Sequence, residues 1–221
     1  SKLGVITFDP IPKMFFKNLK NYRISNIDQK INLFTKLGVD FVVNKNFNRA
    51  FSKVSCFDFI EKTIYQRLSA KYIFVSNNFK FGNKRLGDVN LLKSLEKNYQ
   101  YKIINPSPFK YKKKIISSTL VRKLIEKGNV EKVKKILGRN WEIIGKVERG
   151  RSLGKKIGFP TCNIDIKDYV LAKPGVYAVK VSSKKGNKYL NGIANLGYRP
   201  TFNQKKILLE VHLFNFSGNL Y

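Results

Sequence analysis

The sequence predicts an α/β domain followed by a small all-β domain, and three observations support this. Up to about residue 137, short apolar strands alternate with amphipathic helices. Beyond that point the helical periodicity stops, and short alternating segments follow, separated by Gly, Pro and Asn. The 221 residues, 43% of them hydrophobic, suffice for two cores. We therefore expect one domain over residues 1–137 and another over residues 138–221.

In the first domain we expect strands at 3–8, 41–43, 72–75 and 101–104, the second of them buried. The segments between them carry apolar residues at helical spacing. These helical faces hold Ile27, Ile31, Phe34 and Leu37, capped by Ser25 or Asn26 and ended by Gly38; Phe59, Ile60, Ile64 and Leu68, opened by Ser55; and Leu91, Leu92 and Leu95. Strands alternating with helices predict a parallel sheet covered on both faces, with ligands bound beyond the carboxyl ends of the strands.

Two loops at those ends have side chains suited to a nucleotide. In loop 77–88, Phe79 and Phe81 flank Lys80, and Gly82 permits a tight backbone, so the loop could hold a planar ring and its phosphate. The alternative is a hydrophilic loop pinned by two buried phenylalanines.

The second loop is ISSTLVR at 116–122, where hydroxyl side chains precede an amphipathic helix. Backbone N–H groups at a helix start, together with the Arg122 guanidinium, can bind a phosphate. The hydroxyls could equally serve as a simple helix N-cap.

The second domain shows alternating segments at 141–147, 175–181, 189–196 and 207–214, which predict a small antiparallel barrel or sandwich. Its first part, GKVERGRSLGKKIGFPTCN at 145–163, combines four glycines with five cationic residues. Such a segment suits a phosphate. Residues 145–152 differ from the nucleotide-binding P-loop motif at one position. Glycines and a proline follow, however, where that motif requires a helix.

The net charge of +30 is compatible with nucleic acid, an anionic membrane or a polyanionic substrate. The lysines are spread along the chain, and no nucleic-acid-binding motif is recognisable, so we do not expect nucleic acid as a partner. Two distant cysteines and one histidine argue against zinc and favour free thiols in a reducing cytoplasm. No apolar run approaches the length of a membrane span, and the start is neither a signal nor a transit peptide.

Several motifs occur along the chain in one order. They are TFDPIP at 7–12, FKFGNKRLGD at 79–88, ISSTLVR at 116–122, GFPTCN at 158–163, PGVYAV at 174–179, GIANLGYRPTF at 192–202 and LEVHLFNF at 209–216. Together they resemble the bacterial bifunctional riboflavin kinase and FMN adenylyltransferase (FAD synthetase) family. The resemblance implies a Rossmann-like nucleotidyltransferase domain before a β-barrel riboflavin kinase domain. The substrates it implies are riboflavin, FMN and ATP, with Mg²⁺ as the metal, in a cytoplasmic protein that is a monomer or a weak homo-oligomer.

In the kinase half, the resemblance implies that Glu210 is the general base. The expected nucleotide-binding residues are Gly150, Gly154, Gly158, Pro160, Thr161 and Asn163. Thr161 and Asn163 are also the expected metal ligands, because hard cations take oxygen ligands. His212 is expected to be structural.

In the adenylyltransferase half, the nucleotide-binding residues implied are Ser117, Ser118, Thr119 and Arg122, and the flavin-binding residues are Asn78, Phe79, Phe81 and Gly82. Three departures from the family pattern stand out. Its opening phosphate motif would lie upstream of Ser1, a usual histidine is Ile11, and the glycine and aspartate expected before FKFG are Ser76 and Asn78. We therefore expect this half to adenylylate poorly or not at all. The alternative for the whole chain is a non-catalytic basic protein that binds flavin, nucleotide or nucleic acid.

Overall fold

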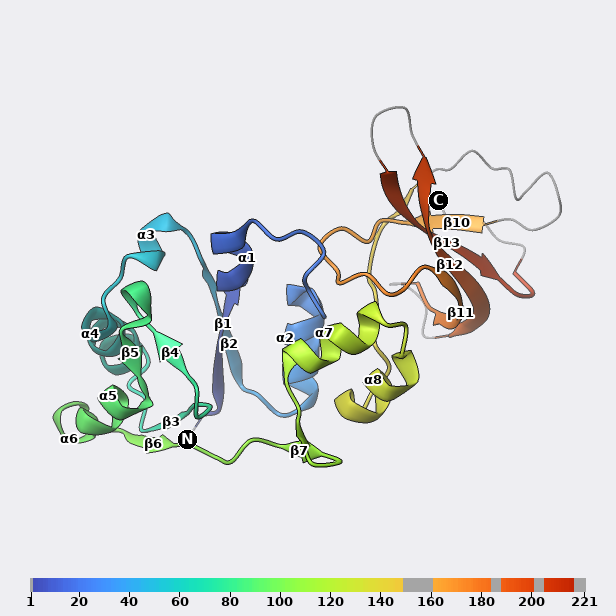
Figure 1. Cartoon of the computed structure of the whole chain (residues 1–221). Helices are drawn as coiled ribbons and strands as arrows, with labels where there is room; N and C mark the ends of the chain where they lie inside the picture. The colour runs from blue at the N-terminus through green and yellow to red at the C-terminus, as the bar shows by residue number, and fades with distance from the viewer. Residues whose placement is uncertain (1, 149–160, 184–187, 201–204, 217–221) are drawn as a thin grey trace. The chain divides into compact units, whose positions relative to one another are not determined.

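The computed structural model describes residues 2–148, 161–183, 188–200 and 205–216 (Figure 1). The chain forms two compact units, the first made of Ser1–Leu19 and Ile31–Ile116, the second of Lys20–Lys30 and Ser117–Tyr221. The second unit takes in residues 117–137, which the sequence pattern assigns to the first domain. It does so because helices from this segment pack on the all-β part. Where the two functions divide along the chain stays a prediction.

Parallel strand pairs form the first unit. Strand β1 (Gly4–Asp9) lies parallel to β2 (Phe41–Asn46), and β3 (Tyr72–Phe74) lies parallel to β6 (Lys102–Ile104). This confirms the mixed α/β character and the parallel direction, although among the described residues hydrogen bonds join these strands only in pairs. The prediction that the second strand is buried was wrong: β2 is half-buried or exposed throughout. Its second half, Asn44 to Asn46, is polar.

Several helices belong to the first unit. They are α1 (Pro12–Lys17), the second half of α2 (Ile27–Lys36), α3 (Arg49–Ser52), α4 (Cys56–Asp58) running into a π-helix (Phe59–Arg67), α5 (Val89–Ser94) and α6 (Glu96–Tyr99). Ile60 and Leu92 are fully buried at the centre of the core. Ser55 caps α4, its Oγ accepting from the Asp58 N–H at 2.9 Å, as the sequence predicts. The remaining strands are short hairpins: β4 (Lys80–Phe81) with β5 (Gly87–Asp88), and β7 (Lys110–Tyr111) with β8 (Lys114–Ile115).

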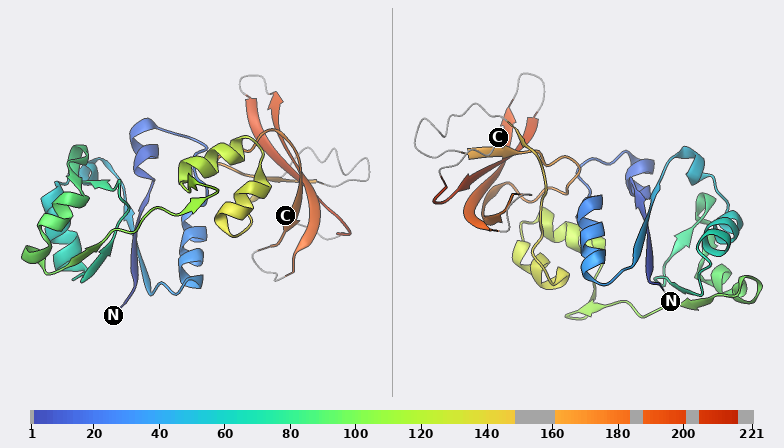
Figure 2. Two further views of the ribbon diagram at one scale, coloured as in Figure 1. Left: turned by 60° about the horizontal axis from the view of Figure 1, so that its bottom comes forward. Right: turned by 180° about the vertical axis from the view of Figure 1, so that it is seen from behind.

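The second unit contains one antiparallel sheet and two helices. The sheet order is β11 (Gly175–Val181), β12 (Leu190–Pro200), β13 (Lys205–Leu213), β10 (Thr161–Ile164) and β9 (Val147–Glu148). The sheet is strongly curved in both views of Figure 2. Helices α7 (Ser118–Glu126) and α8 (Val130–Leu137) share a core with it, centred on Ile125, Val133 and Val170. The antiparallel all-β expectation is confirmed.

The strand expected at 141–147 was wrong, since β9 begins only at Val147. The preceding residues serve instead to attach the segment Lys20–Lys30 to this unit. The Trp141 indole N–H donates to the Ile24 carbonyl at 2.9 Å, and the Gln29 amide donates to the Glu142 carbonyl at 3.1 Å. The Glu142 carbonyl is therefore not available to a strand ladder.

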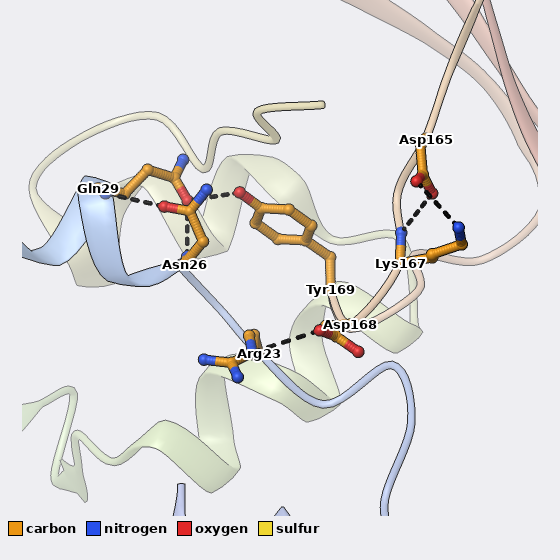
Figure 3. A network of polar contacts seen from close by, with 7 residues as sticks. All are labelled: Arg23, Asn26, Gln29, Asp165, Lys167, Asp168 and Tyr169. Atoms are coloured by element: carbon orange, nitrogen blue, oxygen red, sulfur yellow. Dashed lines mark hydrogen bonds and ion pairs between the residues drawn. The ribbon is translucent and has the colours of Figure 1, made fainter. Parts of the chain in front are cut away.

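A polar network strengthens the same attachment (Figure 3). Asn26 and Gln29 form a reciprocal capping box at the start of α2, with N–H to side-chain oxygen distances of 2.8 and 2.9 Å. The buried Tyr169 hydroxyl donates to Gln29 Oε1 at 2.7 Å and accepts from the Ile144 N–H at 3.2 Å. This network holds residues 141–144 and 165–170 in place, and these flank β9 and β10, the strands of the candidate site.

Candidate functional site

Two of the predicted kinase residues face each other across neighbouring strands. In the register of β10 and β13, Asn163 lies directly opposite Glu210. Side chains at such positions stand on the same face with Cβ atoms roughly 5 Å apart. Alternation within 207–214 predicts that Glu210 and His212 share one face and that Leu209, Val211 and Leu213 share the other. The structure confirms this, because Val211 and Leu213 belong to an apolar cluster with Cys162 and Ala194.

The pair belongs to a row of polar residues that crosses four strands. Glu148 on β9 lies opposite Asn163, and Asn195 on β12 lies opposite Glu210. Two residues along the strands, Thr161 lies opposite His212. The same face therefore presents carboxylates, amides, a hydroxyl and an imidazole, while the opposite face is apolar.

Asn163 differs from its neighbours in the row in being buried. Its side chain is 7% exposed, and its Oδ1 atom accepts no hydrogen bond from any described residue. A buried oxygen left unpaired costs about 1–3 kcal/mol. Glu210 and Glu148 are half-buried beside it, and Thr161 is exposed.

These residues fit a hard divalent cation such as Mg²⁺, which binds carboxylate and amide oxygens. The described residues hold no group of three or more His, Cys, Asp or Glu that could bind a metal alone. Mg²⁺ in phosphoryl-transfer sites is held by one or two protein oxygens together with substrate phosphates. The orphaned Asn163 oxygen matches such a partial site. The predicted nucleotide-binding residues Gly150, Gly154, Gly158 and Pro160 lie outside the described residues.

The predicted phosphate-binding residues of the adenylyltransferase lie at the start of α7. Ser117 is the N-cap, its Oγ accepting from the Leu120 N–H at 3.2 Å, and the side chains of Ser117, Ser118 and Thr119 are exposed. The capping role that the sequence analysis left open is thus present for Ser117. It does not occupy the hydroxyls of the next two residues, for which no such cap is described.

Arg122, one turn into α7, is held against Tyr22. Its Nε donates to the Tyr22 carbonyl at 2.7 Å, and its guanidinium lies 3.7 Å from the centre of the Tyr22 ring. Burial lowers the pKa of the Arg122 guanidinium, which nevertheless stays charged at neutral pH. The Nε is therefore used within the protein, and the two terminal nitrogens are the part of the fork suited to a phosphate.

The predicted flavin-binding residues lie in the first unit, and two of them contribute to its core. Phe81 is 8% exposed and packs on Phe59. The Phe79 ring stacks on the Phe81 ring, with 5.4 Å between the ring centres. This matches the alternative of a loop pinned by phenylalanines. Asn78 Oδ1 accepts from the Ser76 hydroxyl at 3.0 Å. Ile11, the other departure from the family pattern, precedes α1 and its carbonyl accepts from the Met14 N–H at 2.8 Å.

Gly82 has φ +72°, and a Cβ there would lie 2.6 Å from the Cys56 backbone nitrogen. We expect Gly82→Ala to lower the free energy of unfolding by more than the roughly 1–3 kcal/mol that a strained backbone alone costs. Gly38→Ala is the matched control, because Gly38 has φ +77° with nothing within 4 Å of the added atom. Chemical denaturation of both variants measures the difference. If both variants lost the same free energy of unfolding, loop 77–88 would be able to shift and accommodate the added Cβ.

Sequence analysis missed Glu148 and Asn195 as members of the polar row. Glu148 sits in a segment read as a glycine-rich phosphate loop, and Asn195 within a motif that was used only for resemblance. Nothing in their spacing from Glu210 along the chain signals proximity. The strand register alone brings them together.

Comparisons with known proteins cover both halves of the chain. Residues 1–120 match the family model described as FAD synthetase, and residues 137–221 match the one described as riboflavin kinase. A protein of Buchnera aphidicola subsp. Schizaphis graminum is 39% identical over 98% of this chain and 70% of its own length. Relatives from Haemophilus influenzae and Escherichia coli K12 are 37% and 34% identical, over 99% and 98% of this chain and 71% and 69% of their own lengths. All three are named bifunctional riboflavin kinase/FMN adenylyltransferase.

A solved structure also matches. The crystal structure titled macrolide-efflux protein from Streptococcus pneumoniae has a TM-score of 0.82 and 27% identity, covering all of this chain and 71% of its own. In the described part of this chain, no helix combines the length and apolarity that a membrane crossing requires. The two family models and the named relatives agree with each other. The chain therefore belongs to the family of bifunctional riboflavin kinase/FMN adenylyltransferases, enzymes that phosphorylate riboflavin to FMN and convert FMN to FAD.

Proposed function

We propose that the polar row on β9, β10, β12 and β13 is the riboflavin kinase site, with Glu210 as the general base. The observation that supports this most strongly is the pairing of Glu210 with Asn163, whose buried Oδ1 has no partner among the described residues. A carboxylate next to an unsatisfied amide oxygen is an arrangement that stabilises a fold poorly but suits a cation and a reacting hydroxyl.

In the proposed reaction, the 5′-hydroxyl oxygen of riboflavin attacks the γ-phosphorus of ATP. Glu210 accepts the hydroxyl proton, the bond from the γ-phosphorus to the β–γ bridging oxygen breaks, and ADP leaves with that electron pair. Because phosphoryl transfer depends chiefly on positioning and charge stabilisation, a rigid strand is a suitable support for the base.

Asn163 and Thr161 would hold Mg²⁺ together with the ATP phosphates. When bound, the ion neutralises charge that develops on the transferred phosphoryl group. The roles of Gly150, Gly154, Gly158 and Pro160 in folding the loop over the nucleotide belong to the same proposal and rest on the resemblance alone.

For the adenylyltransferase we propose that Ser118, Thr119 and the terminal nitrogens of Arg122 bind ATP phosphates, with Ser117 shaping the helix start. The FMN phosphate would attack the α-phosphorus, and pyrophosphate would leave. Residues Asn78 to Gly82 would meet the flavin, through Phe79 and backbone groups, since the Phe81 ring is committed to the core. Ile11 and Asn78 stand where histidine and aspartate are usual, so we expect slow adenylylation.

We infer a domain boundary at 137/138 between a Rossmann-like part and a kinase barrel closed from the five-stranded sheet. We also infer a cytoplasmic enzyme, either a monomer or a weak homo-oligomer, that takes riboflavin, FMN and ATP and has no nucleic-acid partner.

A product assay tests the proposal as a whole. The full-length protein is incubated with riboflavin, ATP and Mg²⁺, and riboflavin, FMN and FAD are separated by chromatography. We expect FMN to accumulate with little FAD. Rapid FAD formation would show that Ile11 and Asn78 are tolerated. A folded protein that makes neither product, yet binds RNA in a strongly salt-dependent manner, would instead support a nucleic-acid-binding role.

A further inference from the structure

The strands of the kinase sheet are nearly free of acidic residues. The whole chain has 14 acidic against 44 basic residues. In the described strands β9 to β13, acidic side chains occur at Glu148 and Glu210 alone. Both lie directly opposite Asn163, one on each side. Such a placement of two scarce residues indicates a shared site.

The geometry of the row places the two carboxylates around the amide. Neighbouring strands are about 4.8 Å apart, so the Glu148 and Glu210 backbones are roughly 10 Å apart with Asn163 between them. Glutamate side chains are longer than asparagine, so both carboxylates can approach the space above the Asn163 oxygen. Val147 packs in the apolar cluster of the opposite face, which directs Glu148 to the face of Asn163 and Glu210.

We propose that Glu148 is a further residue of the divalent-cation site of the kinase, supplying a carboxylate on the β9 side of Asn163. The inference rests on the proposed function, since it assumes that the Asn163 oxygen binds the cation. The two acidic residues then have different roles. Glu210 takes the proton of the substrate hydroxyl, and Glu148 raises the affinity for the metal that accompanies the nucleotide.

The test is a titration of the full-length protein with Mn²⁺, first alone and then with ADP, following the free-ion signal by electron paramagnetic resonance. We expect Glu148→Gln to weaken Mn²⁺ binding in the presence of ADP by about tenfold. In kinase assays the same variant should need correspondingly more Mg²⁺, with kcat largely recovered at saturating metal. Glu142→Gln is the matched control, because it makes the same change on an exposed side chain six residues earlier.

Three outcomes separate the inference from the proposal beneath it. Unchanged Mn²⁺ affinity in Glu148→Gln, with weakened affinity in Asn163→Val, would overturn the role of Glu148 alone. Unchanged affinity in both would overturn the cation site itself. A fall in kcat at saturating metal without any change in Mn²⁺ affinity would also overturn the inference, because it would place Glu148 at the reacting groups.

Discussion

Glu210→Gln is expected to lower kcat for riboflavin phosphorylation by about 10²–10⁴-fold, the usual contribution of a general base. Glutamine keeps the size and hydrogen-bonding shape of glutamate but cannot take the proton of the attacking hydroxyl. KM for riboflavin and ATP should change little, because the interaction that is lost belongs to the transition state. Steady-state kinetics at saturating Mg²⁺ measures both constants.

Glu142→Gln again provides the control, since it removes an equal charge from the same unit at an exposed position. Circular dichroism and thermal unfolding should be the same for both variants and the parent. If Glu210→Gln retained the parental kcat, the general base would have to be another residue of the row, and the assignment would be wrong.

Asn163→Val is expected to abolish most MgATP binding while leaving the fold as stable as the parent or more stable. The buried oxygen that lacks a partner costs about 1–3 kcal/mol, and valine is a better strand residue of similar size. If Asn163 stabilised the fold, Asn163→Val would instead lower the free energy of unfolding. Differential scanning calorimetry of the nucleotide-free protein, together with calorimetric titration of MgATP, distinguishes the two.

Asn191→Val is the matched control on a neighbouring strand, because Asn191 is exposed and lies away from the polar row. It should change neither MgATP affinity nor the unfolding temperature by much. Loss of stability in Asn163→Val, with unchanged nucleotide affinity, would show that Asn163 is structural and that the metal binds elsewhere.

Local sequence signals predicted many elements well. The Ser55 cap and the Asn26 cap depend on contacts within a few residues, so they can be recognised from spacing alone. The apolar face of the helix that Ser55 opens is confirmed, since Phe59, Ile60 and Ile64 are buried. The face expected on α2 was wrong in part, because Ile31 and Leu37 are exposed. Strand β11 begins and ends where alternation predicts. Glu210 and His212 share a face for the same reason, because side-chain direction along one strand follows its period of two.

Other features depended on partners far away in the sequence. Trp141 to Lys146 alternates like a strand, but the Trp141 indole and the Glu142 carbonyl bind the segment 20–30 instead. Helices α7 and α8 look like part of the first domain, yet their apolar faces are buried against Ile166, Val170 and Leu196. Arg122 is a plausible phosphate ligand in sequence, and only the fold shows that Tyr22 already holds its Nε.

The sequence by itself determined the two-part organisation and the family, because these follow from local periodicity and from motifs in a set order. Through the family resemblance it also predicted Asn163 and Glu210 as site residues. The tertiary structure decided which residues meet. The pairing of the strands places Glu148 on β9 beside Asn163 on β10, and Asn195 on β12 beside Glu210 on β13. The two residues of each pair are 15 positions apart in the chain. Strand register is a long-range property set by packing of the apolar face, so no local pattern encodes it.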